Sequence, residues 1–157
     1  MSSVIVTFEG INLTGELIVR ELSLHFIDDN VTRHYFFNPP SRLELTRGNR
    51  QTVRYHREIL GGIPLREDLP GAIPHSTLDL LLLSLSEYRI IVAGNVAARF
   101  IASKAPDAEV EDIQQISDFT YPPTMMRSFC GYYHRNDRHC SMSKLWILRN
   151  HVLMMGI

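Results

Sequence analysis

The chain has 157 residues, of which 45% are hydrophobic and 21% charged, and its formal net charge is −1. This length and composition are typical of one globular domain with a sizeable core, so we expect residues 1–157 to form a single domain. A net charge near zero excludes recruitment of nucleic acid by a global positive field. The longest apolar stretch, around Leu80–Leu85 and interrupted by Ser84, is too short to cross a bilayer, and the N-terminus shows no secretory signal. The sequence therefore predicts an intracellular protein in the cytoplasm, the nucleus or both.

The N-terminal third has the period of β-strands. Val4–Phe8 is β-branched and apolar, which is typical of a buried strand. Gly15–Phe26 alternates apolar with polar residues, as a half-exposed antiparallel strand does. Asp28–Asn30 indicates a turn, and Thr32–Phe37 a third strand that ends before Asn38-Pro39. Together these segments predict an antiparallel meander of three strands.

The rest of the chain alternates helical and strand patterns. We expect a helix from Leu43 to Leu60, a helix capped by Ser76, a strand over Arg89–Ala93, a helix from Asn95 to Ser103, a strand over Ala108–Asp112, an irregular stretch over 117–138 and a closing helix over Ser141–Leu153. An antiparallel meander followed by this order resembles the ribonuclease-H fold. The predicted class is α/β, with a mixed five-stranded sheet of three antiparallel and then two parallel strands flanked by helices. A generic α+β domain is the alternative.

Three short motifs resemble those of the DEDD exonucleases, within the ribonuclease-H-like class, but lack most of the acids. Those enzymes hold two divalent cations with four carboxylates. Their Asp-x-Glu is similar to Thr7-Phe8-Glu9. The family's second motif has a strand, a small residue and Asn, and then an Asp on the following helix; Arg99 occupies the position of that Asp. The last motif is a His followed five residues later by an Asp; His139 matches the His, and Lys144 occupies the position of the Asp. The resemblance implies a degenerate exonuclease, because cations at these positions repel Mg²⁺.

An active enzyme remains the alternative to a degenerate one. A divalent-metal ribonuclease or exonuclease could use Glu9, Asp112 at the end of the last predicted strand, and His139. Convergence of these three side chains within metal-bridging distance would favour it. Placement of Arg99 and Lys144 in the same pocket would exclude it.

The segment from Cys130 to Cys140 has the composition of a zinc site. It holds two thiols and two imidazoles within eleven residues, Cys130, His134, His139 and Cys140. These are the sulfur and nitrogen ligands that Zn²⁺ prefers. Adjacent residues such as His139 and Cys140 are poorly placed to bind one ion together, so a Glu or Asp from elsewhere is an acceptable fourth ligand. The alternative is a surface loop with free cysteines and solvated histidines.

This segment and the following Ser141–Trp146 resemble the end of the Maelstrom domain, a ribonuclease-H-like domain in which zinc ligands replaced the exonuclease acids. The alternating strand over Gly15–Leu24 and the strand-ending Asn38-Pro39 are also similar to that family. The resemblance implies a structural zinc ion held by Glu16, Cys130, His134 and Cys140. Three residues separate Cys130 from His134 where the family usually has two, which leaves His139 as a rival ligand. The family's role in small-RNA (piRNA-type) silencing of transposons is implied in the same way.

Basic residues beside aromatic ones predict contact with single-stranded RNA, since the cations meet phosphates and the rings meet unstacked bases. Arginines from Arg47 to Arg57 recur at helical spacing. The predicted RNA contacts are Arg47, Arg50, Arg54, Arg127, Tyr132, Tyr133, Arg135, Arg138 and Lys144. The alternative for the arginines is a solvated helix face, and for Trp146 a place in the core. We expect a zinc-stabilised, catalytically degenerate domain that binds single-stranded RNA, protein partners or both; a protein-interaction scaffold without nucleic-acid affinity is the other class.

Overall fold

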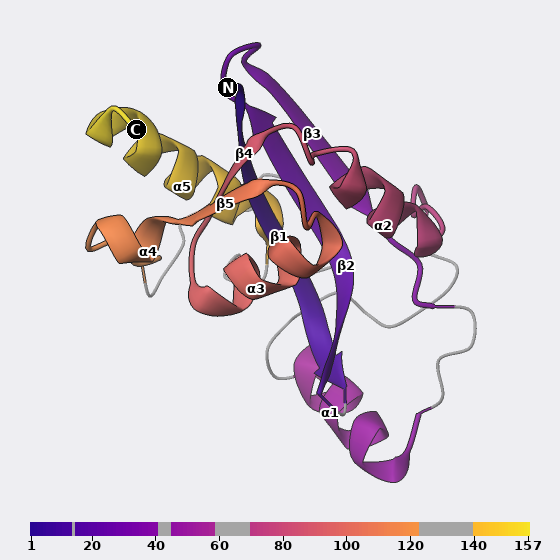
Figure 1. The fold of residues 1–157 in the computed structure, drawn as a ribbon. Coiled ribbons are helices and arrows are strands. Elements are labelled where there is room, and N and C mark those ends of the chain that lie inside the picture. The colour runs from indigo at the N-terminus through magenta and orange to yellow at the C-terminus, as the bar shows by residue number, and fades with distance from the viewer. Residues whose placement is uncertain (14, 41–44, 59–69, 123–139) are drawn as a thin grey trace.

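The computed structural model describes residues 1–13, 15–40, 45–58, 70–122 and 140–157, and its centre is one five-stranded mixed sheet (Figure 1). The strand order is β3-β2-β1-β4-β5. The strands are β1 (Ser3–Leu13), β2 (Glu16–Phe26), β3 (Val31–Phe36), β4 (Arg89–Val92) and β5 (Glu109–Asp112). β1, β2 and β3 pair antiparallel, whereas β1 with β4 and β4 with β5 pair parallel. The predicted mixed α/β sheet is confirmed.

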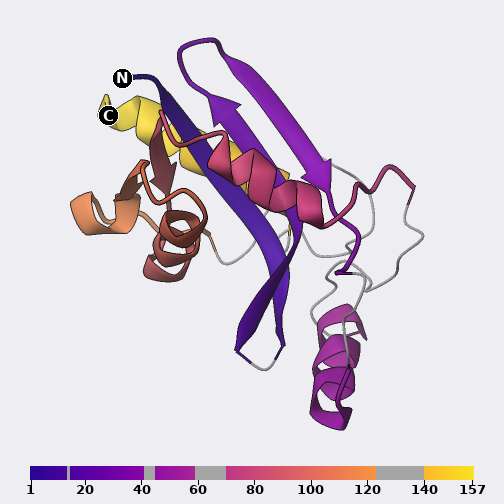
Figure 2. The ribbon, with the colours of Figure 1, turned by 45° about the vertical axis from the view of Figure 1, so that its right-hand side comes forward.

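Helices cover both faces of the sheet (Figures 1 and 2). On one face, α2 (Ser76–Leu83) and α3 (Asn95–Lys104) pack on a core formed with Val4, Val6 and Ile90. On the other face, α5 (Ser141–Met155) buries Leu145, Leu148 and Val152. β1 contributes to both cores because its successive side chains point to opposite faces. The central strand β1 is thus fixed from both sides.

The β1–β2 hairpin extends beyond the main sheet, and α1 (Arg47–Glu58) packs at its far end (Figure 2). A small third cluster there joins Ile11, Leu13 and Ile18 to Val53 of α1. A register shift interrupts the hairpin between Glu9 and Gly10. A Cβ at Gly10 would clash with the Ile18 carbonyl, so only glycine fits this close approach.

Most predicted elements are found with small differences at their ends, but β1 runs to Leu13, where the prediction ended at Phe8. β2 was expected to be half-exposed and is buried along most of its length, because it lies between β1 and β3 and α5 packs on it. Ser76 is the first residue of α2 and not its cap; His75 holds the N-cap position, without a side-chain cap hydrogen bond. The short helix α4 (Ile113–Ile116) was not expected, because four residues carry too little periodicity to detect. The ends of the predicted 43–60 helix, and most of the stretch over 117–138, lie outside the described residues. Within the described ranges, no helix is long and apolar enough to cross a membrane.

Candidate functional site: a cleft beside the start of α5

A cleft of about 300 Å³ opens where β4 ends and α3 begins. Its walls come from β1, from the turn between β4 and α3, and from α5. The lining residues are Val6, Thr7, Phe8, Ala93, Gly94, Asn95, Val96, Ala97, Tyr121 and Lys144. Crevices at the carboxyl ends of parallel strands, where the connections diverge to the two faces of a sheet, are the usual ligand sites of open α/β sheets. The cleft is therefore the leading candidate site among the described residues.

The turn between β4 and α3 is held by Asp112. The backbone of Gly94 has φ 103°, a conformation that residues other than glycine rarely adopt. Its N–H donates to Asp112 Oδ1 at 2.8 Å, and the same oxygen accepts from the N–H of Gln114 at 3.0 Å. Asp112 therefore caps α4 and fixes one wall of the cleft, and this carboxylate oxygen is already engaged by two donors.

The charge inside the cleft is balanced by an ion pair between Lys144 on α5 and Glu9 on β1. The side chain of Glu9 is only 11% exposed and that of Lys144 24%. The Lys144 ammonium also lies 5.4 Å from the centre of the Tyr121 ring. Burial, with a further contribution from Glu9, raises the pKa of the Tyr121 phenol, which therefore stays neutral at physiological pH. The cleft thus presents an ammonium and a neutral aromatic ring, and the carboxylate of Glu9 pairs with that ammonium from outside the lining.

The structure brings together three of the positions singled out by the exonuclease motifs. Thr7 and Lys144 line the cleft, Glu9 pairs with Lys144 next to it, and Thr7 Oγ1 donates to the Ser141 carbonyl at 2.7 Å. Arg99 instead is exposed on α3 and does not line the cleft. His139 lies outside the described residues, so its convergence with Glu9 and Asp112 is untested. In the described part of the chain, no three His, Cys, Asp or Glu side chains are grouped to hold a metal ion.

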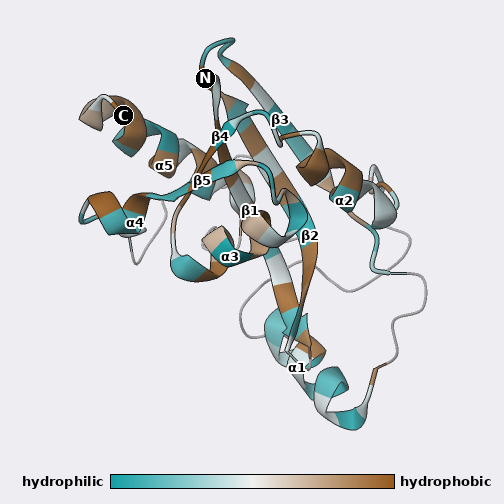
Figure 3. Cartoon of the chain, in the orientation of Figure 1, coloured by the Kyte–Doolittle hydropathy of each residue, from teal (hydrophilic) through white to brown (hydrophobic). Residues whose placement is uncertain are grey.

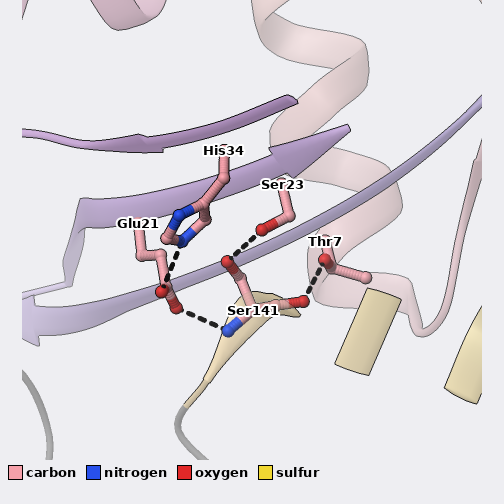
Figure 4. A network of polar contacts seen from close by, with 5 residues as sticks. All are labelled: Thr7, Glu21, Ser23, His34 and Ser141. Carbon is pink, nitrogen blue, oxygen red and sulfur yellow. Dashed lines mark hydrogen bonds and ion pairs between the residues drawn. The ribbon is translucent and has the colours of Figure 1, made fainter. Parts of the chain in front are cut away.

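A buried polar network fastens the first residue of α5 to the sheet (Figure 4). The Glu21 carboxylate is fully buried and accepts from the N–H of Ser141 at 2.5 Å through Oε1. Its Oε2 lies 2.7 Å from His34 Nε2 on β3. The hydroxyls of Ser23 and Ser141 are 2.6 Å apart, and Thr7 bonds to the Ser141 carbonyl. Contacts from β1 and β2 thus fix the start of α5, with β3 holding Glu21 in place through His34. A carboxylate at a helix N-terminus is electrostatically favourable.

Of the predicted zinc ligands, only Glu16 and Cys140 lie in the described residues. Cys140 is fully buried and directly precedes Ser141, which places it beside Glu21. Glu16 is exposed at the start of β2, next to the hairpin turn. Glu21 lies five residues further along β2 than Glu16, which corresponds to roughly 17 Å along the strand. The sequence interpretation passed over Glu21, because in an alternating strand it is one of the polar positions expected to face solvent.

The predicted RNA contacts fall in two places. Arg47, Arg50 and Arg54 are exposed on α1, which is predominantly hydrophilic in Figure 3. Lys144 lies in the cleft. The other predicted contacts, Arg127, Tyr132, Tyr133, Arg135 and Arg138, lie outside the described residues, as do Cys130 and His134.

No family model, no curated protein and no solved structure matches the chain. The fold and the site therefore define the class that can be stated: an α/β domain with a mixed five-stranded sheet and an ion-paired cleft beside its central strand.

Proposed function

We propose that this protein is a catalytically degenerate, exonuclease-like domain of the ribonuclease-H class that binds single-stranded RNA. The ion pair between Lys144 and Glu9 in the cleft carries the proposal. Support for the class comes from the strand order, in which an antiparallel meander continues into two parallel strands across β1. The cleft also lies beside β1, where the exonuclease motif comparison places the first acids.

A two-metal reaction needs several carboxylates around a pair of divalent cations. Here the carboxylate of Glu9 is already neutralised by Lys144. The Lys144 ammonium beside this carboxylate would repel Mg²⁺. The other described acid near the cleft, Asp112, is engaged by the N–H groups of Gly94 and Gln114. These contacts favour a binding cleft over a hydrolytic one.

The RNA part of the proposal is supported by α1. Arg47, Arg50, Arg54 and Arg57 recur every three or four residues, so they form one stripe along the helix. At 1.5 Å per residue the stripe is about 15 Å long. No acidic residue occurs between Arg47 and Arg57. A stripe of this kind suits the phosphates of a nucleic-acid backbone, which supply most of the affinity in such complexes.

We also propose a structural zinc ion. The thiolate of Cys140 would bind it together with Cys130 and His134, with His139 as the rival of His134. Glu21 is nearer to Cys140 than Glu16, which is exposed at the hairpin end. Glu21 would bind the ion by exchanging one of its hydrogen bonds, to Ser141 or to His34, for the metal. The ion would tie the start of α5 to β2, and ligand binding energy of this kind is folding energy.

The cellular setting of the proposal follows from the Maelstrom resemblance. We propose that the domain acts in a small-RNA silencing pathway, inside the cell, with protein partners of that pathway. Binding of RNA to the purified chain is the first requirement of this proposal.

A titration of fluorescently labelled single-stranded RNA of about 20 nucleotides, followed by anisotropy at two salt concentrations, tests the function. We expect binding at low salt that weakens as salt rises. The double variant Arg47→Gln/Arg50→Gln should bind more weakly and reduce the salt slope by about 2, roughly one per lost phosphate contact. Arg99→Gln is the matched control, an exposed arginine on α3 away from the stripe. Absence of binding at low salt would overturn the proposal, and a protein-interaction scaffold without nucleic-acid affinity would remain as the alternative.

A further inference from the structure

Helix α1 carries one exposed aromatic side chain, Tyr55, which is 54% exposed. Within the described ranges, no hydrogen bond, ion pair or ring contact involves it. α1 is held against the far end of the β1–β2 hairpin through Val53. Tyr55 follows Val53 by two residues and so lies about 160° from it round the helix. The ring is therefore on the side of α1 that faces away from the hairpin, where solvent reaches it.

The space beside Tyr55 is open toward the start of α1. Long side chains on a helix lean over the turns that precede them, which here contain Thr52 and Gly48. Thr52 Oγ1 is turned back onto the helix and donates to the Gly48 carbonyl at 3.1 Å. Gly48 has no side chain, and a Cβ at this position would meet no atom within 4 Å. A planar group can therefore approach the Tyr55 ring from this side.

The arginine stripe of α1 runs alongside Tyr55. Arg54 is the preceding residue, about 100° round the helix, and Arg47 lies about 80° away and two turns earlier. Arg47, Arg50 and Arg54 are exposed, and no acidic residue occurs between Arg47 and Arg57. α1 also stands apart from the main sheet, at the end of the hairpin (Figure 2). The exposed part of α1 thus offers a row of cations with an accessible aromatic ring at its side.

We propose that Tyr55 stacks on an unpaired base of the RNA strand whose phosphates bind the arginine stripe, and that this contact favours single strands over duplexes. The inference rests on the proposed RNA binding and names the residue that distinguishes the two kinds of strand. Phosphate contacts alone distinguish them poorly, because both present phosphates. A duplex keeps its bases inside the stack, whereas the bases of a single strand can lie on an aromatic ring. An acidic peptide would pair with the arginines but has no planar base for Tyr55.

The test compares Tyr55→Leu with Tyr55→Phe in the full-length protein. Each is titrated at low salt with a labelled single-stranded RNA of about 16 nucleotides, and with the same strand annealed to its complement. Tyr55→Leu keeps apolar bulk and a good helix former but removes the ring. It should weaken binding of the single strand by about five-fold or more and leave binding of the duplex unchanged. Tyr55→Phe retains a ring and should behave as the wild type.

The outcomes separate this inference from the proposed function. Arg47→Gln/Arg50→Gln is the comparison variant and should weaken binding of single strand and duplex alike. If it does so while Tyr55→Leu binds as the wild type, the inference is overturned and the proposed function stands. Equal loss of both strands by Tyr55→Leu, or a lowered melting temperature of this variant, also overturns it, because neither comes from a solvent-exposed ring that stacks on unpaired bases. No RNA binding by the wild type overturns both, and binding of an oligoglutamate in the same assay would then assign the stripe to an acidic protein partner.

Discussion

The buried carboxylate of Glu21 accepts a hydrogen bond at 2.5 Å from the N–H of Ser141, 120 residues further along the chain. This contact fixes the first residue of α5 against the middle of β2. The same helix carries Lys144 into the cleft and Arg149 toward His25. The polar groups at its start therefore help to position Lys144 in the cleft, while apolar packing holds the rest of the helix.

Replacing Glu21 by Gln should destabilise the fold. An amide of the same size has one acceptor oxygen in place of two, so its NH2 group can meet His34 Nε2 only if that ring nitrogen accepts. The negative charge that is favourable at the N-terminus of α5 is lost as well. We expect a loss of about 1–3 kcal/mol in the free energy of unfolding, measured in urea. Glu16→Gln is the matched control on the same strand, exposed and expected to change stability by less than about 0.5 kcal/mol. Equal stability of the two variants would contradict the role given to Glu21.

Removing the ammonium of Lys144 should also be costly. Lys144→Ala removes the ion pair of the Glu9 carboxylate, which is only 11% exposed. Breaking a buried pair from one side costs about 3–5 kcal/mol. Because solvent reaches Lys144, we expect roughly 2–3 kcal/mol in urea unfolding. The double variant Glu9→Gln/Lys144→Met removes both charges and should recover most of that loss. A double variant no more stable than Lys144→Ala would argue against the ion pair as the cause.

The sequence was sufficient for the sheet but not for the polar contacts within it. Strands such as Val4–Phe8 and helices such as that starting at Asn95 follow from local periodicity, and these elements are present. Glu21 was read as one residue of an alternating strand, because its burial depends on α5 and β3, which pack on it from distant parts of the chain. The motif comparison placed Arg99 in the pocket with Lys144, yet Arg99 is exposed, because a short motif does not fix which side of α3 faces the cleft. Contacts of this kind are set by tertiary packing and not by the spacing of residues in the sequence.

Stability should fall as the pH is lowered through the range in which histidine titrates. Burial lowers the pKa of His25 in the folded state below its usual value of 6.5. The unfolded chain therefore takes up a proton at a higher pH than the folded chain, and stability decreases as pH falls below about 6.5. The decrease stops once the pH passes the folded-state pKa of His25. His75, whose pKa burial also lowers, contributes in the same direction.

His25→Gln isolates the contribution of His25, because the amide can still accept from Arg149 without titrating. Urea unfolding between pH 7 and 5, above the usual range of carboxyl groups, should give a shallower loss of stability for this variant than for wild type. Parallel curves for the two proteins would show that His25 has the same pKa folded and unfolded.

The zinc proposal predicts about one ion per chain by elemental analysis of the purified protein. Cys140→Ser and Glu21→Gln should lower the zinc content, and Cys140→Ser should lower the melting temperature, because loss of a ligand is loss of folding energy. Glu16→Gln should retain the metal. Zinc at less than about half an ion per wild-type chain would contradict the proposal. Retention by Glu21→Gln with loss by Glu16→Gln would return the carboxylate role to Glu16.

The central claim is that this domain binds single-stranded RNA without cutting it. The most direct measurement incubates end-labelled RNA with saturating protein in Mg²⁺ and then in Mn²⁺, and follows both the bound fraction and the length of the strand in the same samples. The account predicts that the RNA is bound and remains full length, because Lys144 occupies the cleft where a metal ion would be needed. Metal-dependent shortening of the RNA that is abolished by Glu9→Gln would contradict it.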